Sequence, residues 1–430
     1  MIFKICTLGC KLNFAESSSL GRQLTDSGHR RAQSGEVADL CIVNTCSVTD
    51  VADQKGRQLI RRLHRENPEA LLIVTGCYAQ LKPDEVSALE GVDYVVGAND
   101  KSKIIEIVKS LASRNQHEQY VTDLASADGR RSKAGSAFHP SRSWDDRTRC
   151  FLKVQDGCDY YCTYCTIPMA RGRSRNASVA DTAHEALDAI HEGAKEIILT
   201  GVNICDFGRS TDESFIDLLR ALDTLPTEEP YRMRISSCEP NLLNDEMIDF
   251  VASSRHFAPH FHIPLQSGSD EVLKIMHRRY DRALFAERVD HIRQRMPHAF
   301  IGVDCMVGVR GETLQMFEDY VDFVSSLSLC QLHVFPYSER TNTKMVSMPL
   351  ERVDKHEQKR RVEVLMEVSR NKLTEFYSAE QGRNATVLWE GKRERKEDGA
   401  ILMSGWTENY VRVSAPFDKQ KVNTFESIII

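Results

Sequence analysis

The chain has 430 residues, of which 41% are hydrophobic and 27% charged, and its formal net charge is −6. This length suggests two or three domains, and the apolar content excludes wholesale disorder. The net charge excludes a globally basic nucleic-acid binder but allows a locally basic surface. We find neither a run of about 20 apolar residues nor a signal peptide, so we expect a cytoplasmic protein with no membrane span.

The first part of the chain, residues 1–125, alternates apolar runs with helical patterns. The runs at residues 2–6, 40–44, 71–76 and 92–97 have the composition of buried parallel strands. Segments with helical spacing lie between them. This alternation predicts an N-terminal domain built on a parallel α/β sheet.

The rest of the chain predicts a linker and two further domains. Residues 126–148 are rich in Ser, Ala, Gly and charge, which is typical of a linker. Residues 149–376 hold six strand candidates separated by helical stretches, which favours a partial or full βα barrel over an open doubly wound sheet. Residues 377–430 contain short alternating strands with Gly turns, which indicates a small all-β domain.

The sharpest motif is C-x3-C-x2-C, formed by Cys158, Cys162 and Cys165 directly after a strand candidate. Three thiolates this close in the chain can converge on one point. Three is one fewer than a closed zinc or iron–sulfur site uses, so a cluster held here leaves one iron open to a small molecule. The alternative is a zinc loop that borrows a fourth ligand from elsewhere.

A second set of cysteines is spread along the N-terminal domain. Cys10, Cys46 and Cys77 each follow a predicted parallel strand. Because loops at the carboxyl edge of a parallel sheet lie close together, these three thiols could meet there. The alternative is that they are buried small residues. For the remaining cysteines we expect core positions without disulfides, although Cys205 and Cys238 lie near strand ends and could approach the barrel cavity.

These motifs resemble a known family. The C-x3-C-x2-C motif at the first strand of a six-fold βα series resembles the radical S-adenosylmethionine enzymes. The segments TLGCKLNFAES, NTCSVTDVAD and VTGCYAQ resemble the three motifs of the methylthiotransferase N-terminal domain. The segments LTGVN, RISSCEPN, HIPLQSGSDEVLKIMHRRY and HVFPYSERTNT also resemble blocks of that family. The C-terminal part is similar to the TRAM domain, a small RNA-binding β module.

The resemblance implies two 4Fe-4S clusters and S-adenosylmethionine as cofactors. The radical-generating cluster would be held by Cys158, Cys162 and Cys165, and the auxiliary cluster by the three N-terminal cysteines. In this family the first cluster cleaves S-adenosylmethionine to a radical that abstracts hydrogen from adenine C2. Sulfur from the auxiliary cluster and a methyl group from a second S-adenosylmethionine then reach that carbon.

Among the branches of the family, the motifs most resemble the one that acts on N6-threonylcarbamoyladenosine at position 37 of tRNA, next to the anticodon. The alternatives are isopentenyladenosine in tRNA, a ribosomal protein aspartate and, more remotely, a non-catalytic metal-stabilised RNA-binding protein. The resemblance further implies an electron donor and a sulfur donor as partners, and we expect a monomer.

Four residues are candidate contacts of S-adenosylmethionine. Thr200 and Gly201 end the second barrel strand, where a glycine permits close backbone approach and where the superfamily binds the methionine amino group. Arg234 and Gln266 lie on or just after later strands and could bind the carboxylate or the ribose. The alternatives are a simple turn glycine and polar residues that are satisfied within the barrel.

Two basic segments are candidate RNA contacts. Arg171, Arg173 and Arg175 directly follow the cysteine loop, and Arg-rich loops contact phosphates and unpaired bases. In the C-terminal domain, Lys392 and Arg393 lie in GKRERK, with Trp389 and Trp406 nearby as candidate stacking platforms. The alternative for both segments is a solvated charged turn.

Overall fold

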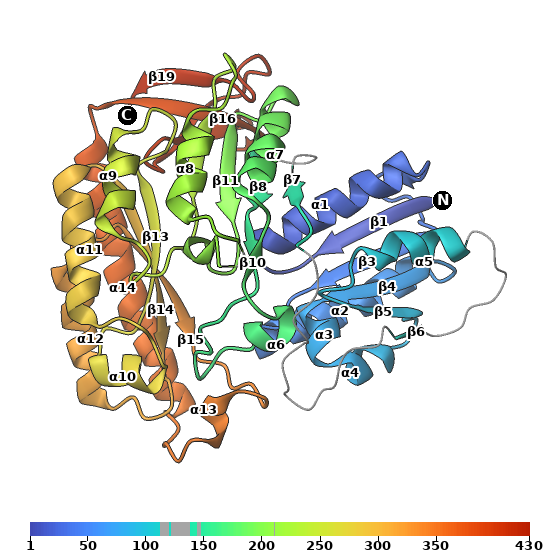
Figure 1. Cartoon of the computed structure of the whole chain (residues 1–430), viewed down its shortest axis with the longest axis horizontal. Coiled ribbons are helices and arrows are strands. Elements are labelled where there is room, and N and C mark those ends of the chain that lie inside the picture. Colours follow the sequence, from blue (N-terminus) through green and yellow to red (C-terminus); the bar gives the residue numbers. More distant parts are fainter. Residues whose placement is uncertain (112–119, 122–137, 144–147, 210) are drawn as a thin grey trace.

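The computed structural model describes residues 1–111, 120–121, 138–143, 148–209 and 211–430 (Figure 1). Most of the predicted linker, including its basic run GRRSK, lies outside these residues. None of the helices in the described ranges combines the length and the apolar composition needed to span a bilayer.

The N-terminal domain is built on a parallel six-stranded sheet in the order β2-β1-β3-β4-β5-β6, which confirms the predicted α/β class. Apolar side chains of β3 and β4 alternate between two core layers, one on each face of the sheet. The strands are β1 (Ile2–Thr7), β2 (Arg30–Arg31), β3 (Leu40–Thr45), β4 (Leu71–Gly76), β5 (Tyr94–Gly97) and β6 (Tyr120–Val121). The helices are α1 (Lys11–Asp26), α2 (Asp50–Glu66), α3 (Cys77–Leu81), α4 (Pro83–Ser87) and α5 (Lys103–Leu111).

The central domain is a partial βα barrel with six parallel strands in two sheets, β12-β11-β8 and β13-β14-β15; a short antiparallel strand, β7 (Ser141–Ser143), extends the first sheet beside β8. Isolated parallel bridges join the sheets at Met233–Phe257 and Ser237–His262. The parallel strands are β8 (Arg149–Lys153), β11 (Glu196–Thr200), β12 (Arg232–Ile235), β13 (His260–Gln266), β14 (Phe300–Val307) and β15 (Gln331–Pro336).

Helices cover the outer face of the barrel (Figure 1). They are α7 (Val179–His191), α8 (Phe215–Asp223), α9 (Asp245–Ser253), α10 (Asp270–Ile275), α11 (Arg282–Arg295), α12 (Leu314–Ser326) and α14 (Lys355–Glu380). Shorter elements lie in the loops, namely β9 (Gln155–Asp156), α6 (Ile167–Arg171), β10 (Arg175–Asn176), the 3-10 helix η1 (Ile204–Asp206) and α13 (Lys344–Ser347).

The barrel strands are apolar on the outside and polar on the inside. Outward side chains such as Leu199, Met233 and Val303 join the large core beneath the helices. Because successive side chains of a strand point to opposite faces, the residues between them face inwards. The inward residues include Lys153, Glu196, Arg234, His262, Asp304 and His333. An interior of this kind suits polar ligands better than a solid apolar core would.

Two predicted domain limits change. Ser141–Ser143, within the expected linker, form β7, which pairs antiparallel with β8 and belongs to the barrel sheet. Its burial against β8 and α1 gave no apolar signal in the sequence, because the strand reads Ser-Arg-Ser. At the other end, α14 runs to Glu380, past residue 376, before the C-terminal strands begin.

The C-terminal domain is an antiparallel sheet in the order β18-β17-β16-β19, as the sequence predicts for a small all-β domain. Its strands are β16 (Asn384–Arg395), β17 (Ile401–Thr407), β18 (Arg412–Pro416) and β19 (Phe425–Ile429). Arg232, at the start of β12, donates to the carbonyls of Thr386 and Trp406 at 3.0 and 3.1 Å. The domain therefore docks at the amino ends of the barrel strands, opposite the cysteine loop (Figure 1).

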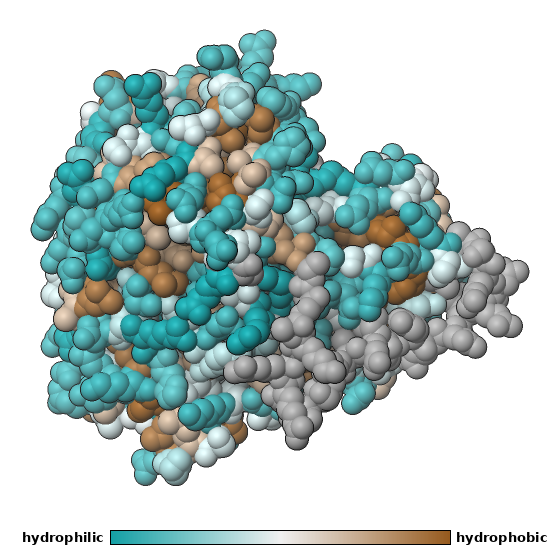
Figure 2. All heavy atoms as spheres, in the orientation of Figure 1, coloured by the Kyte–Doolittle hydropathy of each residue, from teal (hydrophilic) through white to brown (hydrophobic). Residues whose placement is uncertain are grey.

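The surface shown in Figure 2 is mainly hydrophilic, and its hydrophobic residues form small separate patches. Such scattered apolar residues are ordinary for a folded protein surface.

Candidate functional site

The barrel cysteines lie on the loop between β9 and α6, at the carboxyl end of the barrel strands. The sulfur of each accepts one N–H hydrogen bond. The pairs are Tyr160 N with Cys158 (3.4 Å), Arg278 Nη1 with Cys162 (3.2 Å) and Ile167 N with Cys165 (3.4 Å). Donors aimed at sulfur stabilise thiolates, so this loop fits cysteines that bind a metal centre.

Burial raises the pKa of the Cys158 thiol to about 12 and also raises the pKa values of Cys162 and Cys165. These thiols are therefore protonated at neutral pH until a cationic centre displaces the protons. Among the described residues, no three His, Cys, Asp or Glu side chains are grouped to hold a single metal ion.

Arg278 connects this loop to the neighbouring barrel loops. Besides its bond to Cys162, it forms an ion pair with Glu239 and donates from Nε to the Tyr280 hydroxyl at 3.0 Å. Next to Glu239, Cys238 forms a disulfide with Cys205. This pairing corrects the expectation of unpaired core cysteines. It arises because the loops after β11 and β12 are neighbours at one sheet edge.

The N-terminal cysteines lie where the sequence predicts, past the ends of three adjacent strands. Cys10 precedes α1, Cys46 follows β3, and Cys77 begins α3 directly after β4. Gly9 has a φ of 105°, and a Cβ there would lie 2.7 Å from the Cβ of Cys46. A glycine is therefore required for the Cys10 loop to approach Cys46 this closely.

The N-terminal thiols also interact with one another. Burial raises the pKa of the Cys46 thiol to about 12, and the neighbouring Cys77 and Cys10 thiols raise it further. Burial likewise raises the pKa of Cys77, whereas the positive charge of Arg171 lowers it. A barrel arginine thus lies beside Cys77 and favours its thiolate form.

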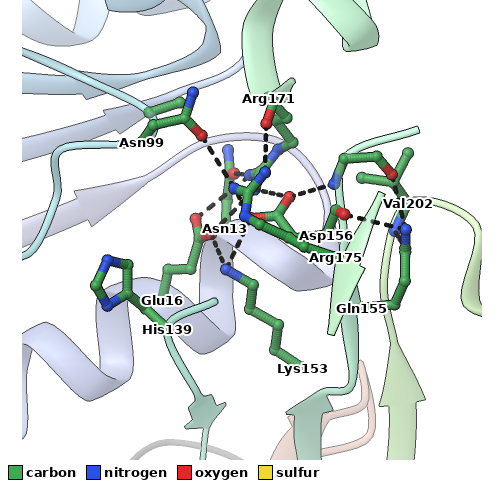
Figure 3. Close-up of polar contacts among 12 residues, drawn as sticks. Asn13, Glu16, Asn99, His139, Lys153, Gln155, Asp156, Arg171, Arg175 and Val202 are labelled. Carbon is green, nitrogen blue, oxygen red and sulfur yellow. Dashed lines mark hydrogen bonds and ion pairs between the residues drawn. The ribbon is translucent and has the colours of Figure 1, made fainter. Parts of the chain in front are cut away.

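Arg171, in α6, is fully buried in a network that crosses from the barrel to the N-terminal domain (Figure 3). Its Nη1 lies 3.0 Å from both Glu16 Oε1 and Asp156 Oδ1, and its Nη2 donates to Asn13 Oδ1 at 2.7 Å. Asn13 in turn donates to the carbonyl of Thr45, at the start of the Cys46 loop. One guanidinium therefore connects the barrel to α1, which begins next to Cys10.

Three further cations complete this network. Lys153 Nζ lies 3.0 Å from Glu16 and 2.9 Å from Asp156, Lys101 pairs with Glu16, and Arg175 lies 2.8 Å from Asp156. Burial alone would raise the pKa of Glu16, but Arg171, Lys101 and Lys153 hold it well below its usual range. The same competition of burial against surrounding cations lowers the pKa of Asp156. Both carboxylates are charged at neutral pH.

A second buried arginine also joins the two domains. Arg340 Nη2 donates to the carbonyl of Ser47 at 2.8 Å and to Asp53 Oδ2 at 2.8 Å, and Nη1 donates to Asp50 Oδ1 at 2.6 Å. Ser47 is the residue after Cys46. Arg171 and Arg340 thus hold the loops of Cys10 and Cys46 against the barrel.

Apolar contact between the two domains is small. Phe14 and Ala15 of α1 pack against Phe151 and Ile198 on the inner face of β8 and β11. Helix α1 therefore lies along the open side of the partial barrel, as Figure 1 shows. Most other described contacts across this boundary are ionic or hydrogen-bonded, so charge largely determines how the domains dock.

Of the four predicted S-adenosylmethionine contacts, Arg234 is already engaged by other protein groups. Arg234 is buried, lies 2.9 Å from Glu196 and donates to the carbonyls of Thr407 and Glu408, so it anchors the C-terminal domain instead. Its place on a barrel strand suggested a ligand, but its partners come from a distant part of the sequence.

The other three candidates remain compatible with a ligand. Thr200 Oγ1 donates to the Leu152 carbonyl at 3.0 Å, and the Thr200 carbonyl accepts from the Val154 backbone N–H at 2.9 Å. A Cβ at Gly201 would lie 2.9 Å from the carbonyl oxygen of Gln155, so tight packing already requires a glycine there. Gln266 has a φ of 64° at the end of β13.

The three arginines after the cysteine loop differ in their exposure. Arg171 is buried, and Arg175 is bound to Asp156 and, at 3.0 Å, to Asn99, so neither is placed to contact RNA as predicted. Arg173 is about half exposed and lies 3.6 Å from Asp159, so it alone keeps the predicted placement. Arg171 and Arg173 belong to the same basic run, but the first is buried and the second is exposed, a difference that the composition of the run does not contain.

In the C-terminal domain, Lys392 and Arg393 are exposed as predicted, and the Arg393 guanidinium lies over the Phe417 ring at 4.3 Å. The tryptophans do not form stacking platforms. Trp389 is 2% exposed and donates to Glu426 at 2.6 Å. Trp406 stacks on Tyr410 beneath Arg149 at the base of the barrel. Both rings are used in packing.

Sequence analysis missed Gln155, Arg278 and Arg340. Gln155 is fully buried. Its Nε2 donates to the Gly157 carbonyl at 2.8 Å, and its Oε1 accepts from the backbone of Val202 and Asn203. It therefore ties the cysteine loop to the loop after β11. The only available signal was the position of all three residues inside segments that resemble family blocks or adjoin the cysteine motif.

Comparisons with known families agree with this organisation. Residues 3–97 match the model described as "Uncharacterized protein family UPF0004", and residues 152–324 match the Radical SAM superfamily. The first match contains Cys10, Cys46 and Cys77, and the second contains the C-x3-C-x2-C loop.

Several curated proteins are similar over nearly the whole chain. The threonylcarbamoyladenosine tRNA methylthiotransferase MtaB of Bacillus subtilis is 36% identical over 408 residues, covering 95% of this chain and 88% of that protein. MtaB of Thermotoga maritima is 34% identical, with coverages of 99% and 93%. A tRNA-2-methylthio-N(6)-dimethylallyladenosine synthase of Carboxydothermus hydrogenoformans is 30% identical, with coverages of 92% and 89%.

Among solved structures, the radical S-adenosylmethionine methyltransferase TsrM of Kitasatospora setae, with cobalamin and a 4Fe-4S cluster bound, superposes with a TM-score of 0.58. The match is 14% identical and covers 80% of this chain and 73% of that one. This likeness concerns the fold alone.

Proposed function

Because the chain belongs to the family of threonylcarbamoyladenosine tRNA methylthiotransferases, which are radical S-adenosylmethionine enzymes, we propose that it adds a methylthio group to C2 of N6-threonylcarbamoyladenosine at position 37 of tRNA. The observation that carries this proposal is the pair of cysteine triads on two domains joined by buried arginines. One triad suits radical generation, and the other suits the supply of sulfur.

The cofactors of this reaction are two 4Fe-4S clusters and S-adenosylmethionine. When bound, they supply a 5′-deoxyadenosyl radical, the transferred sulfur and the methyl group. We assign one cluster to Cys158, Cys162 and Cys165 and the other to Cys10, Cys46 and Cys77. Both triads fit thiolate ligation, because N–H donors meet the barrel sulfurs and Arg171 stands beside the N-terminal thiols.

The residues around the cysteines stabilise thiolate charge and fix the positions of the cysteine loops. Arg278 donates to the Cys162 sulfur and stabilises the negative charge of its thiolate. Gln155 ties the Cys158 loop to the loop after β11, which includes Gly201. Arg171 and Arg340 hold the N-terminal cysteine loops against the domain that carries the other triad. These residues position the ligands and do not themselves react.

We further propose the partners of the reaction. The C-terminal β domain acts as a TRAM-like RNA-binding module, and Arg173 contributes from the cysteine loop. An electron donor and a sulfur donor complete the cycle. The enzyme acts as a monomer in the cytoplasm, where its tRNA substrates are found.

The test is nucleoside mass spectrometry after incubating reconstituted protein with three tRNAs that differ only at position 37. They carry unmodified adenosine, isopentenyladenosine or threonylcarbamoyladenosine. We expect the methylthio product from the last alone at an appreciable rate. The triple variant with Ala at Cys158, Cys162 and Cys165 is the control and should form none. Preference for isopentenyladenosine would move the protein to the neighbouring branch.

A further inference from the structure

Most cations on the inner face of the barrel are engaged by carboxylates. Each occupies one end or wall of the lumen and is unavailable to an incoming anion. The pairs are Arg149 with Glu390 (3.2 Å), Lys153 with Glu16 (3.0 Å), and Arg232 and Arg234 with Glu196 (2.6 and 2.9 Å). Any negatively charged group that enters the lumen must find another cation.

Lys11 is different. It directly follows Cys10, its side chain is exposed, and it forms no hydrogen bond or ion pair with any residue in the described ranges. Its ammonium nevertheless lies among barrel charges. Arg149 and Arg234 repel it, while Glu196 and Asp304 attract it. Its charge in turn acts on His260 of β13 and His333 of β15.

These neighbours come from six different strands of the barrel, so the side chain of Lys11 enters the lumen from its open side. The packing of α1 agrees with this direction. Phe14 and Ala15, one turn further along the helix, rest on the inner-face residues Phe151 and Ile198. The Lys11 ammonium therefore lies between an N-terminal cysteine ligand and the inner wall of the barrel.

Helix stability does not explain this lysine. A cation in the first turn of a helix is repelled by the helix dipole, and the first turn of α1 contains no acidic residue to offset it. Exposed lysines that serve solubility are on the outer surface instead. A cation kept unpaired among other charges beside a reaction centre is expected where an anion binds.

We propose that Lys11 binds the carboxylate of the threonylcarbamoyl group and so selects this substrate. The inference rests on the proposed function. A carboxylate of this type is ionised at neutral pH, whereas a dimethylallyl group carries no charge. An ion pair at this position would favour threonylcarbamoyladenosine and would hold the modified base beside Cys10, where the sulfur is supplied.

Anticodon stem-loops test this contact without turnover. One carries threonylcarbamoyladenosine, and a second carries the same group with the carboxylate replaced by a carboxamide. Fluorescence anisotropy measures their binding to the full-length reconstituted protein. We expect the native protein to bind the acid about 10- to 100-fold more tightly than the amide, as a charge-assisted hydrogen bond requires.

Variants then assign the preference to Lys11. Lys11→Gln should bind acid and amide equally, and Lys11→Arg should retain part of the preference. Lys4→Gln is the matched control, because Lys4 lies in β1 of the same domain and pairs with Glu66 at 3.1 Å. It should behave as the native protein does. Iron content and 5′-deoxyadenosine formation without RNA should be unchanged in all three variants.

Three results would overturn the proposal. The native protein could bind acid and amide equally, or Lys11→Gln could keep the full preference for the acid. Alternatively, Lys11→Gln could weaken S-adenosylmethionine binding and leave the RNA preference intact, which would assign the ammonium to the methionine carboxylate. Failure of the proposed function is distinguishable, because the native protein would then form no methylthio product on threonylcarbamoyladenosine in tRNA.

Discussion

Arg171 and Glu16 form a buried ion pair between the two domains that carry the cysteine triads, with 3.0 Å between Nη1 and Oε1. Their positions differ by 155 in the sequence. Arg171 lies six residues after Cys165, and Glu16 lies six residues after Cys10. The pair therefore couples the placement of one triad to that of the other.

We expect Arg171→Met to loosen the N-terminal domain from the barrel. Removing one partner of a buried pair costs about 3–5 kcal/mol, because the remaining carboxylate stays desolvated. Hydrogen exchange should show earlier opening of α1 and unchanged protection of β14. S-adenosylmethionine cleavage should continue while methylthiolation falls. Arg173→Met, at an exposed neighbouring position, is the control. Unchanged protection of α1 in Arg171→Met would contradict this role.

Acid should release the same contact. The pKa values of Glu16 and Asp156 are lowered in the folded protein, so the unfolded chain binds more protons in acid. Their contribution is complete above the ordinary carboxyl pKa of about 4 and is lost as the pH falls below it. The thermal midpoint should stay level from pH 8 to about pH 5 and then fall. Glu16→Gln should start lower and fall less, and an equally steep fall would exclude Glu16 as its source.

The two triads should be separable by function. Cys158, Cys162 and Cys165 lie on one barrel loop, whereas the other three depend on a different sheet, so loss of one site leaves the other. Replacing Cys10, Cys46 and Cys77 by Ala should remove about half of the iron and all methylthio product, with 5′-deoxyadenosine formation retained. The barrel triple variant should form no 5′-deoxyadenosine. If the first variant kept the iron content and the methylthio product yield of the native protein, Cys10, Cys46 and Cys77 would be packing residues and not cluster ligands.

RNA binding should depend on Arg173 and on the C-terminal domain. Each lost phosphate contact lowers the slope of log affinity against log salt by about one. Arg173→Ala should show this change in tRNA binding titrations and leave S-adenosylmethionine cleavage intact, as should Lys392→Ala with Arg393→Ala. Arg30→Ala, an exposed arginine of β2, serves as the control. If the salt dependence of tRNA affinity were unaltered, these residues would not contact RNA phosphates.

The sequence predicted the parts of the molecule that depend on local pattern. Apolar runs located the parallel strands, and the positions of Cys10, Cys46 and Cys77 just past those strands placed them at one sheet edge. The three barrel cysteines were found by spacing alone. Each of these inferences uses residues that are close in the chain or topology that follows from the strand type.

The failures concern partners that are distant in the sequence. Arg171 and Arg173 have the same local composition, but only Arg171 meets Glu16 and Asp156. Arg234 resembled a ligand contact because its carboxylate and carbonyl partners belong to other strands and to another domain. Trp389 was predicted to be a stacking platform, but its indole N–H donates to Glu426, which is distant in the sequence. Residue type predicts chemistry, whereas burial depends on tertiary contacts that local patterns do not contain.

The placement of Arg340 has a consequence for domain exchange. Its guanidinium belongs to the barrel but satisfies Ser47 and Asp53 of the N-terminal domain. An N-terminal domain transplanted onto a foreign barrel would leave the Asp53 carboxylate buried with Lys82 as its only described cation. A working chimera must therefore carry the arginine together with the domain that it serves. The set of residues that must be exchanged together therefore extends across the domain boundary.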